Sequence, residues 1–548
     1  MSPPGLRSLG SESLARSLSW GALRTPQTPR TGAFRGRWRP LAVGLAVLLL
    51  SVAAVVAWSL PRSGGHLVYA LDDAYIHMAM ARNLAEHGVF GVTRHGFTSS
   101  SSSPLWTLLL AGVFALFGPR DVLPLALNVV FAAGLLVVAD RVLRDRGVGA
   151  AARGLALVAV VVLTPVPPLV LVGQEHLLHA TITLLFVGAL ASAPPRPALL
   201  GLAPLLTATR YEGLFLVLVA CVVLAARRRA GLALALGLAA LVPVAVYGVV
   251  SISHGGYALP NPVILKGALG EGLTGWRRLA LVPLLGGWDE LLRTPHVLAL
   301  VVLALVALAA RWRSPSSPEG TLLIAFVGTA ILHLQYARTG WFYRYEAYLV
   351  AFGIVAGAAA LDGLRDRVRP AWLPAALAAA AALVGAVRGV RAHVETPGAV
   401  GNIYEQQVQV GRFLARFYAG AAVAANDIGA IDWLADLRVL DLWGLASREV
   451  AEAKLTGRYT TAAIADLARV RGVRVAVIYE RWLDAAGGVP PEWVRAGRWR
   501  VARNVVLGDR TVAFYAVDPA EAGPLADHLR AFAPDLPSGV AQLGPFTR

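Results

Sequence analysis

The stretch Leu71-Asp72-Asp73-Ala74-Tyr75-Ile76-His77 follows shortly after an apolar run, Pro40–Leu60, that is long enough for one membrane span. The adjacent carboxylates Asp72 and Asp73 therefore fall where a chain leaving the bilayer enters the aqueous layer. Either carboxylate can cap the helix that follows, because a helix N-terminus has free N–H groups and favours negative charge. His77 is four residues from Asp73 and so lies on the same face of that helix.

The helix that begins at the Asp pair continues past Arg82. It is too polar to span the membrane and too apolar to stay in water, so we expect it to lie along the membrane surface. A carboxylate pair held at a membrane face is well placed to act as a base. The alternative interpretation, in which the carboxylates only cap the helix, stays open at this point.

The composition defines the class of protein. Of 548 residues, 56% are hydrophobic and only 15% are charged, and the mean hydropathy is +0.60. This predicts an α-helical polytopic membrane protein, because spans of about 20 apolar residues need such a composition and a soluble domain does not. The net charge of +17 does not indicate a nucleic-acid partner, since the basic residues are spread through loops and termini. The single cysteine, Cys221, excludes an intrachain disulfide.

The N-terminal segment 1–39 contains seven Arg and many Ser, Pro and Gly residues, which predicts a disordered basic tail. Because Arg35, Arg37 and Arg39 directly precede the first apolar run, the positive-inside rule places this tail in the cytoplasm. The run is too long for the apolar region of a signal peptide, so we interpret it as a retained anchor.

The segment 40–392 is the predicted transmembrane domain, and 61–103 is its first outer loop. Twelve apolar segments have the composition of membrane spans, and we expect 11 to 13 transmembrane helices in all. The segments are 40–60, 104–118, 122–139, 152–171, 176–192, 198–209, 212–226, 231–250, 297–311, 320–337, 342–361 and 371–391, and 279–287 could add one more.

Charge and span order disagree for the loop 141–153, which carries four Arg residues. Its charge predicts a cytoplasmic loop, whereas counting from the first span places it outside. Either 104–118 does not cross the membrane fully or the charge rule fails here. The run Ser99–Ser103 that precedes this segment is typical of a flexible linker, although its last residue is a good N-cap for a helix beginning at Pro104.

Near residue 393 the long apolar runs stop, and short strand and helix patterns alternate. This change predicts a separate soluble α/β domain over 393–548, which is large enough for a core of its own. Strands are predicted at 421–425, 438–442 and 473–479, a helix at 460–471, and a hairpin of 498–507 and 510–517 turning at Gly508-Asp509.

Ionisable residues interrupt several apolar segments, where each costs about 2.5–3.5 kcal/mol on insertion scales. They are candidates for a functional site, and the alternative is that they mark loops in which the charges are solvated or paired. We prefer the loop interpretation for Arg338 and the functional one for Arg344, which lies between two tyrosines. Lys266 is one of only two lysines, and a compact cation on a flexible stem suits phosphate binding. The other residues of this kind are Glu175, Arg210 and Glu212.

An ordered set of short motifs resembles the GT-C glycosyltransferases, in particular bacterial members related to the cell-wall arabinofuranosyltransferases. At two positions this chain departs from the family pattern, with Gln174 where Met is common and Tyr211 where Pro is common. The motifs are Asp72-Asp73-Ala74-Tyr75, Ala81-Arg82-Asn83-Leu84, Ser103-Pro104-Leu105-Trp106, Gly173-Gln174-Glu175, Thr209-Arg210-Tyr211-Glu212-Gly213, Pro260-Asn261-Pro262 with Lys266, Tyr343-Arg344-Tyr345, Asn426-Asp427-Ile428-Gly429-Ala430-Ile431 and Val439-Leu440-Asp441-Leu442-Trp443-Gly444-Leu445.

The resemblance implies a multi-pass enzyme of the cytoplasmic membrane that inverts the anomeric carbon while moving a sugar from a polyprenyl-phosphate donor to a glycan, lipid or protein acceptor of the cell envelope. The lipid phosphate is a good leaving group, so the reaction needs one carboxylate base and cations for the phosphate. Asp72 or Asp73 is the expected base, Lys266 and Arg344 are the expected phosphate ligands, and Arg82 is a weaker candidate. Residues expected to contact substrate or support the site are His77, Glu175, Arg210, Glu212, Tyr343 and Tyr345.

The resemblance also places the C-terminal domain outside the cell membrane, over the active site, and implies no cofactor, although a divalent metal is not excluded. We prefer Asp72 as the base, because a side chain just before a helix is freer to reach a substrate, with Asp73 capping the helix and orienting His77. Asp72, Asp73, Lys266 and Arg344 are predicted to line one cavity. The alternative function is a transporter or flippase, which predicts inverted repeats that we do not find in the sequence.

Overall fold

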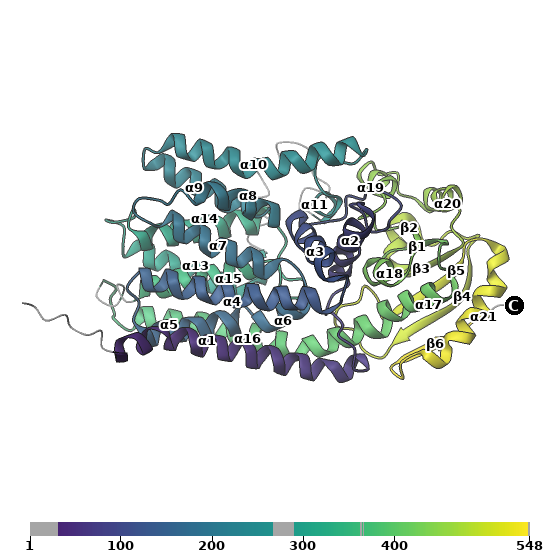
Figure 1. Ribbon diagram of the computed structural model, residues 1–548, viewed down its shortest axis with the longest axis horizontal. Coiled ribbons are helices and arrows are strands. Elements are labelled where there is room, and N and C mark those ends of the chain that lie inside the picture. The colour runs from purple at the N-terminus through teal and green to yellow at the C-terminus, as the bar shows by residue number, and fades with distance from the viewer. Residues whose placement is uncertain (1–30, 267–289, 362–363, 365–366, 546–548) are drawn as a thin grey trace, which may run out of the picture.

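Apolar helices run side by side along most of the molecule, and a sheet domain lies at one end (Figure 1). The computed structural model describes residues 31–266, 290–361, 364 and 367–545. The helices before the sheet domain are α1 (Thr31–Ser59), α2 (Asp73–His87), α3 (Pro104–Phe117), α4 (Val122–Asp145), α5 (Ala150–Leu163), α6 (Val166–Val172), α7 (His176–Leu190), α8 (Leu199–Thr209), α9 (Gly213–Ala226), α10 (Ala230–Ser253), α11 (Asn261–Lys266), α13 (Pro295–Ala309), α14 (Pro318–Tyr336), α15 (Ala347–Leu361) and α16 (Leu373–Ile403).

Every apolar segment predicted from 40–60 to 371–391 contains a helix, whereas 279–287 lies outside the described residues. The segment 152–171 is a bent pair, α5 and α6, whose axes differ by 42°. In the described part of the chain, four helices are long and apolar enough to cross a membrane, or five if the bent pair counts as one span. Shorter apolar helices, such as α7 and α15, lie among them, so the number of 11 to 13 spans stays a prediction.

The conflict over the loop 141–153 concerns α3 and the ends of α1 and α4. The guanidinium of Arg144, near the end of α4, lies 5.7 Å from the ring centre of Trp38 in α1, so this loop shares an end of the bundle with the start of the first span. Helix α3 packs instead against α2 beside the sheet domain (Figure 1). Its 14 residues extend only about 21 Å, less than the apolar thickness of a bilayer. This position favours the alternative in which 104–118 does not cross the membrane fully, and that topology stays a prediction.

The C-terminal part contains one mixed sheet of six strands in the order β2-β1-β3-β5-β4-β6. Strands β2, β1 and β3 are parallel, and β5, β4 and β6 continue the sheet in antiparallel pairs. The elements are β1 (Ala422–Ala425), β2 (Arg438–Asp441), β3 (Val475–Ile478), β4 (Val494–Val501), β5 (Thr511–Ala516), β6 (Val540–Leu543), α17 (Gln409–Phe417), α18 (Gly429–Leu434), α19 (Arg448–Leu455), α20 (Thr461–Val470) and α21 (Ala522–Phe532).

Alternate residues of the central strands serve two apolar cores, as the two-residue period of a strand requires. Val423 packs in one core with residues of α17 and α21, whereas Ala424 packs in the other with residues of α19 and α20. The strands predicted from the sequence are present, and β4 pairs with β5 as predicted. Their connection is longer than the predicted Gly508-Asp509 turn, since β4 ends at Val501.

Two predicted boundaries fall inside helices. Helix α1 begins at Thr31, inside the segment 1–39 that the sequence predicts to be disordered. The composition change near 393 lies within α16, which continues through a π-helical turn, Tyr404–Val408, into α17. The helical stretch Leu373–Phe417 therefore joins the bundle to the sheet domain without a linker.

Candidate functional site

The two neighbouring carboxylates serve different partners. Asp72 is the N-cap residue of α2, yet its side chain makes no capping hydrogen bond to that helix. Its two oxygens accept instead from the backbone N–H groups of Gly429 (2.6 Å) and Ala430 (2.8 Å), which open α18 in the C-terminal domain. A Cβ atom at position 429 would lie 2.1 Å from the carbonyl oxygen of Asp72, so glycine is required at this close approach. Burial raises the pKa of Asp72.

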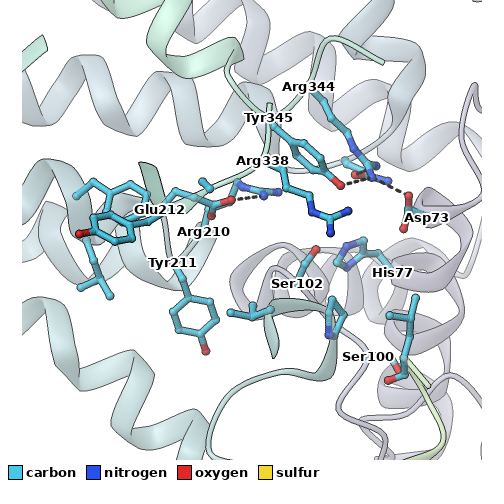
Figure 2. Close-up of a pocket in the computed structure, with 18 of the residues that line it drawn as sticks. Asp73, His77, Ser100, Ser102, Arg210, Tyr211, Glu212, Arg338, Arg344 and Tyr345 are labelled. Carbon is cyan, nitrogen blue, oxygen red and sulfur yellow. Dashed lines mark hydrogen bonds and ion pairs between the residues drawn. The ribbon is translucent and has the colours of Figure 1, made fainter. Parts of the chain in front are cut away.

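Asp73 faces the other way, into a cavity of ≈ 470 Å³ at the same end of the bundle. Its Oδ2 accepts from the Arg344 guanidinium at 2.7 Å, as the dashed line in Figure 2 marks. The Asp73 side chain keeps 25% of its surface exposed, whereas that of Arg344 keeps 3%. Asp73, rather than the preferred Asp72, is therefore the carboxylate that a ligand in this cavity can reach.

The wall of the cavity contains both charged and apolar side chains. His77, Arg210, Glu212, Arg338 and Arg344 line it together with Asp73, and Figure 2 shows Arg338 projecting toward His77 and Ser102. The apolar part of the wall includes residues of α9, α14 and α11, namely Leu214, Phe215, Leu218, Leu332, Tyr336, Pro262 and Val263. Such a cavity can hold a molecule with an anionic head and an apolar chain.

A buried ion network supports the charged part of the cavity wall. Arg210 donates to Glu175 and to Glu212, each at 2.6 Å, and so joins the turn before α7 to the turn before α9. His77 shares a hydrogen bond of 2.9 Å with Thr107, and its Nε2 lies 3.8 Å from Glu175, beyond hydrogen-bond reach. Burial lowers the pKa of His77, although the charge of Glu175 opposes this shift. The neutral imidazole is therefore favoured beside Asp73.

Some of the N–H donors around the cavity have no acceptor. Among the described residues, no hydrogen-bond partner exists for Nε2 of Gln174 or for the Nε atoms of Arg210 and Arg344. All three residues line the cavity and are at most 7% exposed. Buried N–H groups without partners are costly, and several of them beside one cavity favour an anionic or oxygen-rich ligand there.

Three predicted site residues lie elsewhere or are only partly described. Arg82 donates to the carbonyl oxygens of Trp433 (2.7 Å) and Asp432 (2.9 Å), so its guanidinium is committed to the contact with α18. The Tyr343 hydroxyl donates to Glu395 at 2.6 Å in a neighbouring cavity, whereas Tyr345 lines the cavity of Asp73. The backbone of Lys266 ends α11, but its side chain lies outside the described residues.

The serine run is a structural part of the site rather than a flexible linker. Ser99 shares a hydrogen bond of 2.7 Å with Tyr247, and Ser100 donates to the carbonyl oxygen of Leu445 in the C-terminal domain at 3.1 Å. Ser100 and Ser102 also line the cavity. Five consecutive small donors before a Ser-Pro helix start are the only signal of this role in the sequence.

Arg338, Gln174 and Tyr211 also line the cavity, although the sequence analysis did not select them as site residues. The loop interpretation of Arg338 is compatible with its exposed position, but the loop opens into the cavity (Figure 2). Within the residues described, no group of three or more His, Cys, Asp or Glu side chains could hold a metal ion.

The helical bundle with this cavity under a C-terminal sheet domain has the fold of the GT-C glycosyltransferases. The crystal structure of ArnT from Cupriavidus metallidurans bound to undecaprenyl phosphate has a TM-score of 0.50 and 15% sequence identity, covering 86% of this chain and 98% of that one. The apo state of the same protein has a TM-score of 0.47 and 16% identity, covering 87% and 99%. At this identity the likeness shows the fold, and the resemblance predicted from the sequence is confirmed at that level.

A domain of unknown function, DUF8728, matches residues 401–515, which include β1 to β4 and most of β5. No curated protein matches the chain. The activity therefore has to be argued from the site itself.

Proposed function

We propose that this protein is a membrane glycosyltransferase that moves a sugar from a polyprenyl-phosphate donor to a hydroxyl group of a glycan, lipid or protein of the cell envelope. The observation that carries the proposal is the meeting of Asp73 and Arg344 in a cavity that is also lined by many apolar side chains. The undecaprenyl phosphate bound to ArnT, which has the same fold, combines a phosphate head with an isoprenoid chain. A molecule of this kind suits a cavity with charged and apolar wall residues.

The roles follow from the chemistry of the transfer. The acceptor oxygen attacks the anomeric carbon, the bond from that carbon to the phosphate oxygen breaks, and the acceptor proton passes to the Asp73 carboxylate. The leaving phosphate carries its negative charge toward Arg344, with Arg338 as a second cation at the cavity wall. No general acid is needed because the phosphate is already a good leaving group. A single displacement of this kind inverts the anomeric carbon.

The ion pair between Asp73 and Arg344 makes the base dependent on the donor. A guanidinium at 2.7 Å stabilises the charged carboxylate and weakens it as a base. A donor phosphate beside Arg344 offsets that positive charge, so the affinity of Asp73 for a proton rises when the donor is in place. A guanidinium carries five N–H donors, and those of Arg344 that bond Asp73, Gln174 and Tyr345 are not all of them, so the side chain can hold Asp73 and phosphate together.

The proposed location is the outer face of the cytoplasmic membrane, with the N-terminus in the cytoplasm. The loops 141–153 and 227–229 carry clusters of Arg, and each follows a helix that leads away from the sheet domain. The positive-inside rule assigns that end to the cytoplasm and the cavity with the C-terminal domain to the opposite side. Lys266 remains a proposed phosphate ligand at the α11 edge of the cavity.

The test is turnover of a polyprenyl-phosphate sugar by the purified chain in detergent or nanodiscs. Asp73→Asn keeps the shape and removes the base, so we expect kcat to fall by about 10²–10⁴-fold. Glu86→Gln, which changes an exposed carboxylate on the same helix, is the matched control and should keep wild-type turnover. Near-normal turnover of Asp73→Asn would place the base elsewhere, with Glu175 the next carboxylate to change.

A further inference from the structure

Gln174 occupies a fixed position at the wall of the cavity. It lies in the turn between α6 and α7, directly after Gly173, whose φ of +71° is left-handed. The ring of Tyr69 fills the space where a Cβ of residue 173 would stand, at 2.4 Å, so this turn has little freedom. Gln174 is 2% exposed and lines the cavity beside Arg344.

The contacts of Gln174 determine which way its amide points. Its Oε1 accepts from the Arg344 guanidinium at 2.7 Å and lies 3.2 Å from Nε2 of His176. A guanidinium only donates hydrogen bonds, so the atom facing Arg344 has to be the amide oxygen. The amide nitrogen therefore lies on the other side and has no acceptor among the described residues.

We propose that Gln174 determines which donor is accepted, by donating a hydrogen bond from its side-chain amide to an oxygen of the donor head group. This inference rests on the proposed function, since it assigns a ligand to the same cavity. The amide is one contact from Arg344, which itself contacts Asp73, so the bound oxygen belongs to the reacting end of the donor and not to its chain. Both a sugar hydroxyl and a phosphate oxygen have the required acceptor chemistry.

A purely positioning role would act through Arg344, which Gln174 holds by its oxygen. The two roles are separated by a double-mutant cycle, in which Gln174→Met is made in the wild-type chain and in Arg344→Gln. Methionine has nearly the volume of glutamine but offers no N–H. If Gln174 contacts the donor, the effect of Gln174→Met persists without the Arg344 guanidinium, whereas a positioning effect disappears.

The readout is the Kd for two probes, undecaprenyl phosphate and an undecaprenyl-phosphate sugar that the wild-type chain binds, so that no turnover is required. We expect Gln174→Met to weaken binding of the sugar donor by about 10- to 100-fold in both backgrounds. An effect on the sugar donor alone identifies a sugar oxygen, and an equal effect on both probes identifies a phosphate oxygen. Gln335→Met on α14, away from the cavity lining, is the matched control.

Unchanged affinities in Gln174→Met, or an effect that vanishes in Arg344→Gln, would overturn the inference. If Gln174→Met does not give a folded protein, Gln174→Leu replaces it in the same cycle. Binding of the sugar donor by a wild-type chain that never transfers the sugar would contradict the proposed function and leave this measurement valid.

Discussion

Asp72 and Asp73 are adjacent in the sequence but belong to two different regions of the molecule. Asp72 lies in the seam between α2 and the C-terminal domain, where both of its oxygens accept from backbone N–H groups of α18. Asp73 lies in the cavity, where one oxygen accepts from the side chain of Arg344. The seam uses fixed backbone donors, whereas the cavity uses a side-chain cation and leaves several N–H groups without a partner within the part of the chain that the structure describes.

This difference shows what a carboxylate needs in order to act as a base. Each oxygen of Asp72 accepts from a backbone N–H group that cannot move without shifting a helix, so its carboxyl group serves the contact between α2 and the C-terminal domain. Arg82 strengthens the same seam from α2, by donating to carbonyl oxygens of α18. Asp73 has a partner that a phosphate can recruit, so its charge can serve a reaction. Proximity in sequence does not make the two residues equivalent.

The largest effect on turnover is expected when the buried cation of the cavity is removed. Arg344→Gln should lower kcat by about 10²–10³-fold, because a preorganised donor to the leaving phosphate is lost. Arg338→Gln, on an exposed side chain at the cavity wall, should change kcat/KM by less than about fivefold and only at low salt. Steady-state kinetics with a polyprenyl-phosphate sugar measure both effects. Equal losses in the two variants would show that the cavity does not distinguish a buried cation from an exposed one.

A second prediction concerns the seam. Asp72→Ala leaves the buried N–H groups of Gly429 and Ala430 without an acceptor, which should cost about 1.5–3 kcal/mol of stability and lower Tm by several degrees. Thermal unfolding in detergent measures this loss.

Gly429→Ala provides the control for charge, since it opens the same seam by steric contact and keeps both carboxylates. It should lower Tm in the same direction, and both variants should keep the Asp73-dependent reaction within about tenfold. A variant of Asp72 that is inactive at unchanged Tm would reverse the roles assigned to the two carboxylates.

Much of the fold follows from local patterns in the chain. The apolar segments are long enough to define helices, and short continuous apolar runs mark β1 and β3, because both patterns depend only on nearby residues. The sequence could not show that α3 packs beside α2. Its composition is that of a span, and the packing of its 14 residues depends on other parts of the fold.

The site could be predicted only in part, for a similar reason. The polar motifs at 72–73, 173–175, 209–213 and 343–345 mark one end of the bundle, and charges inside apolar segments reveal them. The choice between Asp72 and Asp73 depends on Gly429, which lies 357 residues away in the chain. The preferred prediction gave the capping role to Asp73, whereas Asp72 is the carboxylate that accepts from the start of a helix, and that helix is α18 instead of its own.

The last prediction concerns Lys454 of α19, which lies inside the C-terminal domain and not in the seam. Its ammonium donates to the carbonyl oxygen of Trp443 at 2.9 Å and lies 4.3 Å from the centre of that indole ring. This contact holds the loop that leads to Leu445, which lines the cavity and accepts from Ser100. Burial lowers the pKa of Lys454 from 10.5 to about 8.

The sign of the pH dependence follows from this shift. Between pH 8 and pH 10.5 the unfolded chain keeps the proton of Lys454 while the folded chain has released it. Stability therefore rises with pH across that window, by at most about 3 kcal/mol, and the gain is lost as the pH falls through the folded pKa. Lys454→Met lacks the titrating group, so its Tm should rise less than the wild-type Tm between pH 7.5 and pH 10. Parallel Tm curves for the two proteins would show that the carbonyl oxygen and the indole ring of Trp443 stabilise the ammonium of Lys454 as well as water does.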